Sequence, residues 1–103
     1  MPRKKLTTLT EQMYYVLLVL DNERCGSEIV SAVQDLTKNR IKLGAGTLYT
    51  ILSLFEEEEI IQETKILGRK RMYQITSHGR SLLNQEIRRL KQMLIDTQHY
   101  KEE

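Results

Sequence analysis

The chain has 103 residues, a hydrophobic fraction of 40% and a formal net charge of +2, which fits one globular domain and excludes a disordered or strongly basic chain. Binding to nucleic acid would therefore depend on local basic patches and not on a global field. Basic residues outnumber acidic ones within residues 62–103, and acidic residues prevail within residues 1–61.

The single cysteine, Cys25, cannot form an internal disulfide, which fits a reducing compartment. We expect a small, half-buried turn residue there, with a redox-sensing thiol as the alternative. No apolar run approaches the roughly 20 residues of a membrane span, and the basic N-terminus is not followed by a signal-peptide pattern. We therefore expect a cytoplasmic protein.

Residues 1–8 are predicted to be a flexible basic arm. Thr10 can cap a first helix over residues 10–21, with Glu11 in the first turn, where the helix dipole favours negative charge. The apolar residues of this helix cover more than one stripe, so we expect one side to face the core and the other a subunit interface that includes Tyr14 and Leu18.

A turn over residues 22–26 leads into a second predicted helix over residues 26–38. Residues 41–43 alternate like a short strand. Gly44 and Gly46 are then expected to supply the backbone freedom that starts a third helix.

The third helix, within residues 43–61, is the segment around which the chain is organised. Its apolar residues fall at i, i+3, i+4 and i+7 and predict one buried face: Leu48, Ile51, Leu52 and Phe55. Thr47, Thr50 and Ser53 fall on the opposite face, which is small, uncharged and rich in hydroxyl groups. Such a face suits a helix that enters a DNA major groove, although an ordinary solvated helix is the simpler alternative. Two helices and a turn before a third helix form a helix-turn-helix arrangement.

The acidic run over residues 56–59 is expected to close this helix as a solvated end. A metal site is the alternative, but consecutive helical positions point around the axis and do not converge on one ion. We expect no metal and no cofactor.

Residues 60–66 and 71–76 are predicted to form the strands of a β-hairpin whose turn contains Gly68. Basic side chains gather at its tip: Lys65, Arg69, Lys70 and Arg71. Behind a helix-turn-helix, such a hairpin is a wing that can hold phosphates or enter a minor groove, whereas alone it would be read as a solubilising feature.

Thr76 can cap a last helix that runs to about Tyr100. Its apolar positions are spaced four, three and four residues apart and predict a coiled-coil-like dimer interface: Leu83, Ile87, Leu90 and Leu94. The alternative is that this seam folds back on the chain's own core. The expected division is an arm over residues 1–8, a winged-helix domain over residues 9–76 and a dimerisation helix over residues 77–103.

Residues 41–49, Ile-Lys-Leu-Gly-Ala-Gly-Thr-Leu-Tyr, resemble the signature of PadR-type winged-helix transcriptional regulators, in which Gly-Thr-Leu-Tyr opens the recognition helix. Residues 9–17 and 68–79 are similar to that family's first helix, wing and start of the last helix. The length resembles the short subfamily with one C-terminal dimerisation helix. The resemblance implies a DNA-binding repressor, usually dimeric. The chain has no tryptophan, which some short members use to hold flat aromatic drugs, so that effector class is not carried over.

We therefore predict a mostly α (α+β) winged helix-turn-helix protein that binds a palindromic operator as a homodimer. Any small-molecule effector is expected in a pocket between the first and last helices across the dimer, lined by Tyr14, Leu18 and Leu90. The residues expected to contact double-stranded DNA are Lys42, Thr47, Tyr49, Thr50, Ser53, Lys65, Arg69, Lys70 and Arg71, with Lys4 and Lys5 as weaker candidates. The alternative is a winged-helix module that binds another protein. An enzyme is not expected, because no nucleophile–base pair appears and His78 and His99 have no partners at usable spacing.

Overall fold

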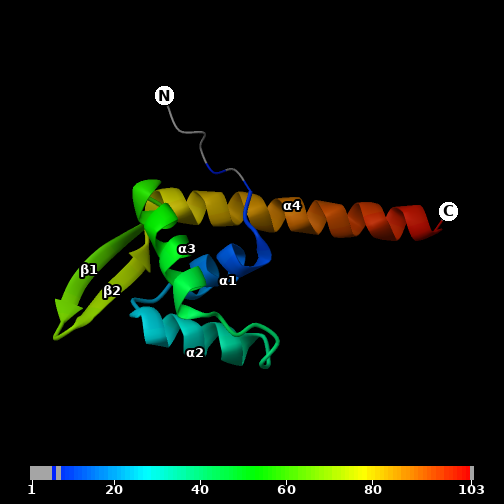
Figure 1. The fold of residues 1–103 in the computed structure, drawn as a ribbon. Helices are drawn as coiled ribbons and strands as arrows, with labels where there is room; N and C mark the ends of the chain where they lie inside the picture. Colours follow the sequence, from blue (N-terminus) through cyan, green and yellow to red (C-terminus); the bar gives the residue numbers. More distant parts are fainter. Residues whose placement is uncertain (1–5, 7, 103) are drawn as a thin grey trace.

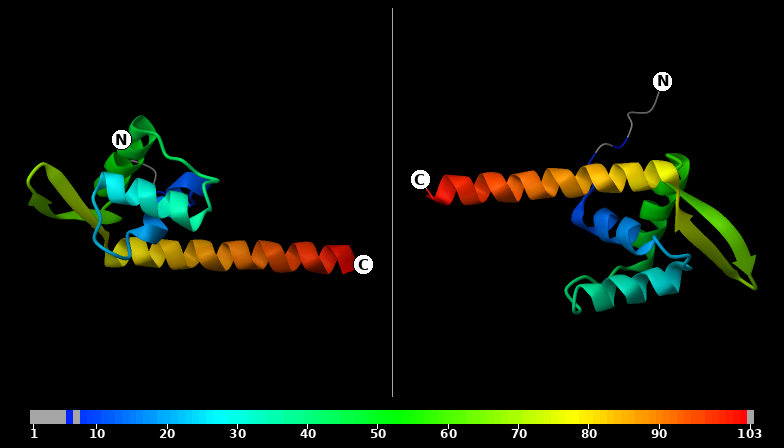
Figure 2. Two further views of the ribbon diagram at one scale, coloured as in Figure 1. Left: turned by 90° about the horizontal axis from the view of Figure 1, so that it is seen from below. Right: turned by 180° about the vertical axis from the view of Figure 1, so that it is seen from behind.

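The structure is a computed structural model that describes residue 6 and residues 8–102. In chain order its elements are α1 (Glu11–Val19), α2 (Gly26–Leu36), α3 (Ala45–Glu57), β1 (Ile61–Leu67), β2 (Lys70–Ile75) and α4 (Ser77–Glu102). The first three helices pack together, the hairpin projects from one end, and α4 runs along the body and beyond its other end (Figures 1 and 2). The predicted class, a mostly helical winged helix-turn-helix, is confirmed.

The predicted basic arm falls largely outside the described residues, and so do its two weaker DNA-binding candidates, Lys4 and Lys5. At the start of α1, the Thr10 side chain accepts a hydrogen bond from the Met13 N–H at 3.2 Å, which confirms the predicted cap. None of the helices in the described part of the chain is long and apolar enough to cross a membrane.

The core is formed by the apolar faces that helical spacing predicts. Buried side chains of α1 and α2 meet those of α3, and the latter are the predicted set: Leu48, Ile51, Leu52 and Phe55. Phe55, Leu17 and Ile29 are fully buried. Because these apolar residues occupy one face of α3, the opposite face of that helix is left at the surface.

The prediction of a strand over residues 41–43 is wrong. Ile41 and Leu43 are buried and Lys42 is exposed, so the alternation is real, but the described residues form a sheet of only two strands. The Ile41 N–H donates to the Thr37 hydroxyl at 3.1 Å instead of to a neighbouring strand. Arg24 bridges to Tyr73 of β2 through paired backbone hydrogen bonds of 3.0 and 2.8 Å. The alternation of apolar and polar residues therefore reflects which side chains are buried in the core, and it does not indicate a paired strand.

The expected role of Gly44 and Gly46 is also wrong. Gly44 has φ −78° and ψ 157°, and Gly46 lies within α3 with no positive φ. Both conformations are open to any residue, and a Cβ atom added at either position would meet nothing within 4 Å. Gly68, by contrast, has φ +62° in the hairpin turn, where glycine avoids the strain that a side chain would bring.

The hairpin is antiparallel, with Ile61 opposite Ile75 at its base and Leu67 opposite Lys70 at its tip. The register shifts between Glu63 and Lys65. The base is buried against the helices, whereas every residue of β1 after Ile61 is exposed. The hairpin thus forms a wing that is anchored at its base and open at its tip (Figure 1).

α4 begins against the core and ends in solvent. The Thr76 hydroxyl accepts a hydrogen bond from the Gly79 N–H at 3.0 Å, and Leu82, Leu83 and Glu86 of its first turns are buried. From residue 88 to residue 102 every residue is exposed. The apolar stripe of α4 therefore packs against the chain's own core, as in the alternative stated above, only in the first part of the helix.

Candidate nucleic-acid interface

The exposed face of α3 has the residues that the sequence predicts. Thr47, Tyr49, Thr50 and Ser53 are all exposed, and Tyr49 keeps 65% of its surface accessible. The Thr50 hydroxyl donates to the carbonyl oxygen of Gly46 at 2.9 Å, one turn earlier in the same helix. The exposed face of α3 therefore has no charged side chain near its start and is accessible to a large partner.

A cleft of about 210 Å³ separates this face from the wing. Four of the predicted DNA-binding residues line it: Tyr49, Arg69, Lys70 and Arg71. The start of α2 forms its third wall, through Gly26 and Ser27. We call this the wing cleft. Because it brings the recognition helix, the wing and a helix N-terminus to one surface, it is suited to hold a backbone phosphate beside a groove.

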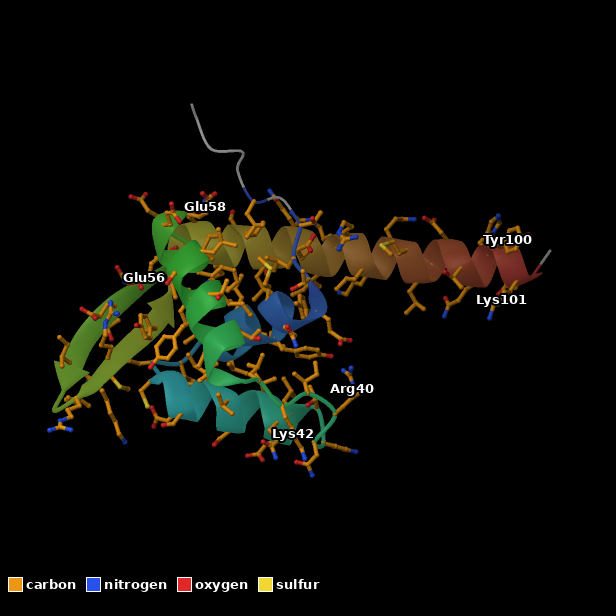
Figure 3. All side chains as sticks on the ribbon, in the orientation of Figure 1. Arg40, Lys42, Glu56, Glu58, Tyr100 and Lys101 are labelled. Atoms are coloured by element: carbon orange, nitrogen blue, oxygen red, sulfur yellow. The ribbon has the colours of Figure 1, made fainter. Side chains whose placement is uncertain are left out.

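The basic residues of the wing differ in their surroundings. Arg71 pairs with Glu63, lies 3.5 Å from a carboxylate oxygen of Glu56 on α3, and has its guanidinium over the Tyr73 ring at 5.4 Å. The Glu63 hydrogen bond is the main cause that raises the pKa of Arg71 above its ordinary value. Figure 3 shows Glu56 on the side of α3 that faces the hairpin. Arg71 thus links the wing to the recognition helix.

Lys65 is also engaged within the chain, in an ion pair with Glu23 at 3.0 Å. Hydrogen bonds from Thr64 and then from Lys65 lower the pKa of Glu23. Arg69 and Lys70 make no ion pair within the described part of the chain and lie next to the Gly68 turn. The four basic residues predicted as one phosphate-binding group therefore divide into two at the tip and two that brace the wing.

Lys42 lies away from this group, on the loop between α2 and α3, together with Arg40 (Figure 3). Arg40 is held by Glu11 at 3.0 Å and by the Tyr15 hydroxyl at 3.1 Å, whereas Lys42 is exposed. Lys42 thus lies near the end of α2, away from the wing cleft at its start.

Sequence reasoning missed Ser27, which lines the wing cleft. Its neighbour Cys25 is 3% exposed, and its sulfur lies 3.3 Å from the Ser27 hydroxyl oxygen. The Cys25 N–H donates to Glu28, and this hydrogen bond is the main cause that lowers the pKa of Glu28. The signal in the sequence was the small hydroxyl residue directly after the start of a helix.

The predicted dimer-interface residues fall into two groups. Leu83 is buried in the protomer's own core, and Ile87 and Leu18 are half-buried and pack against it. Leu90 and Leu94 keep 41% and 59% of their surface exposed. Further along α4, Met93, Ile95 and Tyr100 are also exposed, and Figure 3 shows Tyr100 far from the body of the protein.

A second cleft, of about 310 Å³, lies between the start of α1 and α4. Tyr14 and Leu90 line it as predicted for an effector pocket, but Leu18 instead borders a separate hollow next to α2. The cleft also contains Glu86, which sequence reasoning missed. Glu86 is 2% exposed and accepts hydrogen bonds from the Leu9 N–H at 2.7 Å and from Arg89 at 2.8 and 3.1 Å.

These hydrogen bonds, that from Arg89 above all, hold the pKa of Glu86 below its ordinary value. The buried carboxylate therefore stays charged and ties the segment before α1 to α4. Within the described residues, no group of three or more histidine, cysteine, aspartate or glutamate side chains could hold a metal ion.

Comparison with known proteins agrees with this geometry. The model of the transcriptional regulator PadR-like family matches residues 16–85. A PadR-like transcription factor from Bacteroides fragilis superposes with a TM-score of 0.73 at 22% identity, over 85% of this chain and 87% of that one. A transcriptional regulator from Clostridium thermocellum gives 0.71 at 21% identity, over 84% and 87% of the two chains. An uncharacterised protein of Lysinibacillus sphaericus is 28% identical over 75 residues, which are 69% of each chain.

Proposed function

The chain belongs to the PadR-like family of transcriptional regulators, and from that premise we propose that it is a cytoplasmic, dimeric repressor that binds a palindromic DNA operator. The observation that carries the proposal is the shared surface of α3 and the wing. An uncharged, accessible helix face adjoins a cleft that Arg69 and Lys70 line. This is the combination by which a helix enters a major groove while cationic side chains hold the flanking phosphates.

In this proposal Thr47, Thr50 and Ser53 face the base pairs, and Tyr49 contacts the backbone next to the wing cleft. Phosphates are held by Lys42 on one side and by Arg69 and Lys70 on the other. Arg71 acts mainly by fixing the wing relative to α3, through Glu56, and Lys65 by fixing it relative to the turn between α1 and α2, through Glu23.

Dimerisation is proposed through the second part of α4. Residues 88–102 are exposed on every side, yet they include five large apolar side chains: Leu90, Met93, Leu94, Ile95 and Tyr100. A second copy of the chain would cover them, and a two-fold axis would present two recognition helices to the two halves of a palindrome. The cleft that Tyr14, Glu86 and Leu90 line is the proposed place for an effector.

A gel shift on the DNA upstream of the protein's own gene, with unrelated competitor DNA, tests the proposal. About 6–10 phosphate contacts per dimer predict an affinity loss of about 10³–10⁵ between 50 and 200 mM salt. Arg69→Ala with Lys70→Ala should abolish the shift while the dimer stays intact, with Lys101→Ala at the far end of α4 as the matched control. No shift at low salt from a folded dimer would favour the alternative, a module that binds another protein.

A further inference from the structure

The recognition helix contains none of the side chains that read purines through paired hydrogen bonds. Between Ala45 and Glu57 there is no arginine, lysine, asparagine, glutamine or histidine. Arginine and lysine read guanine in the major groove, and asparagine and glutamine read adenine. Apart from Tyr49, which the proposed function assigns to the DNA backbone, the exposed side chains from Ala45 to Ser53 offer only hydroxyl groups and methyl groups, and they belong to Ala45, Thr47, Thr50 and Ser53.

The geometry of Thr50 favours its methyl group over its hydroxyl. The hydroxyl hydrogen is used within the helix, in the 2.9 Å bond to the Gly46 carbonyl oxygen. This back-bonding holds the side chain in one rotamer. The hydroxyl of the exposed Thr50 can therefore only accept a further hydrogen bond, whereas its methyl group is free to contact a partner.

The start of α3 lets a partner come close. Gly44 and Gly46 are required neither by their backbone angles nor by any neighbour, since an added Cβ would meet nothing within 4 Å. Ala45, between them, is exposed. Methyl contacts have a short range and lose much of their energy over a gap of about 0.5–1 Å. A helix that contacts bases through short side chains must therefore lie deep in the groove. The first turn of α3 allows this because it has no large exposed side chain.

From these three features we propose that α3 reads the C5-methyl groups of thymines in each half-site, through Ala45, Thr47 and Thr50. The half-sites of the operator then present thymine, and not guanine, to the first two turns of α3. This inference rests on the proposed function, since it requires α3 to enter a major groove. It adds the chemical class of base that the helix selects.

The test starts with selection of operators from a library of random duplexes by the full-length protein. Each thymine of a selected half-site is then replaced by deoxyuridine, which pairs in the same way and lacks only the methyl group. The affinity should fall about fourfold for each contacted methyl, the ratio that corresponds to burying one such group. The same replacement in the flanks of the duplex is the control and should leave affinity unchanged.

A pair of variants ties the effect to Thr50. Thr50→Val keeps a methyl at the same place and should bind the thymine operator within about twofold of the original protein, whereas Thr50→Ser loses the methyl in both protomers and should bind about sixteenfold more weakly, which is about fourfold for each half-site. On an operator with deoxyuridine at the contacted position of both half-sites, Thr50→Ser should cause no further loss. Melting temperatures of both variants serve as the check that they fold.

The outcomes separate the two levels of the proposal. A selected operator that loses affinity on uracil substitution, with the Thr50 pattern above, supports the inference. A selected operator whose affinity is unchanged by uracil, or whose half-sites present guanines to α3, overturns the inference and leaves the proposed function standing. Failure to select any duplex overturns the proposed function and the inference with it.

Discussion

Replacing Gly46 by alanine should stabilise the protein and weaken its binding to DNA. Gly46 is the second residue of α3, has no positive φ, and an added Cβ would have open space around it. Glycine in a helix costs about 0.5–1 kcal/mol relative to alanine. For a domain of this size, that gain should raise the melting temperature by about 2–8 °C.

The same methyl group would stand on the surface that we propose lies against the groove. An extra methyl in a close-packed contact costs about 1–3 kcal/mol, which corresponds to about 5-fold to 150-fold in affinity. Thermal unfolding followed by circular dichroism and a gel shift on the selected operator measure the two effects on one variant. The combination of higher stability and weaker binding separates a contact with DNA from damage to the fold.

Gly79→Ala is the matched control. A Cβ atom there would lie 2.1 Å from the backbone oxygen of Ile60 and 2.9 Å from the Cγ1 atom of Ile75. Neither neighbour can yield without moving the hairpin base, so this variant should melt at a clearly lower temperature. A lower melting temperature for Gly46→Ala would show that the fold itself needs this glycine, which would refute our reasoning that Gly46 serves contact with DNA. If Gly46→Ala binds DNA with unchanged affinity, the start of α3 does not lie close against the DNA.

Three further variants test the other surfaces. Arg69→Ala should weaken DNA binding uniformly across sequences and lower the salt slope by about one phosphate per protomer, as measured by titration at several salt concentrations. Leu94→Glu should yield monomers by analytical ultracentrifugation without lowering helix content, because Leu94 is 59% exposed in the protomer; an intact dimer would contradict the proposed interface. Glu86→Gln should cost about 1–3 kcal/mol in denaturant unfolding, since its carboxylate accepts hydrogen bonds from Arg89 and Leu9. Because folding lowers the pKa of Glu86, its carboxylate should contribute to the free energy of unfolding above the unfolded-state pKa. This contribution should be lost as the pH falls through the folded-state pKa, and Glu86→Gln should remove this part of the acid sensitivity.

The elements that the sequence predicts well are those encoded by neighbouring residues. The buried face of α3 follows from helical spacing alone, and the Thr10 and Thr76 caps follow from a hydroxyl residue before an apolar run. The hairpin turn follows from Gly68. In each case the residues that decide the structure lie close to one another in sequence.

Features that depend on partners distant in the chain could not be predicted. Arg71 and Lys65 pair with Glu56 and Glu23, and nothing in the neighbouring sequence shows that these carboxylates come within reach of them in the fold. The burial of Glu86 could not be predicted from its neighbours in the last helix either. Its carboxylate accepts a hydrogen bond from the Leu9 N–H, which is 77 positions away in sequence.

The seam of α4 shows why periodicity alone leaves the partner of a helix open. Leu83 and Leu94 belong to the same predicted stripe, yet the first is 7% exposed and the second 59%. A helix of 26 residues is about 39 Å long at 1.5 Å per residue, so the small helical core can cover only its beginning. The pattern encodes an apolar stripe, and the size of the core decides how much of that stripe the protomer covers itself. We propose that a second copy of the chain covers the rest. That boundary falls near Ile87, the last residue of the stripe that packs against the protomer's own core. Substitutions on either side of it should therefore separate folding from association.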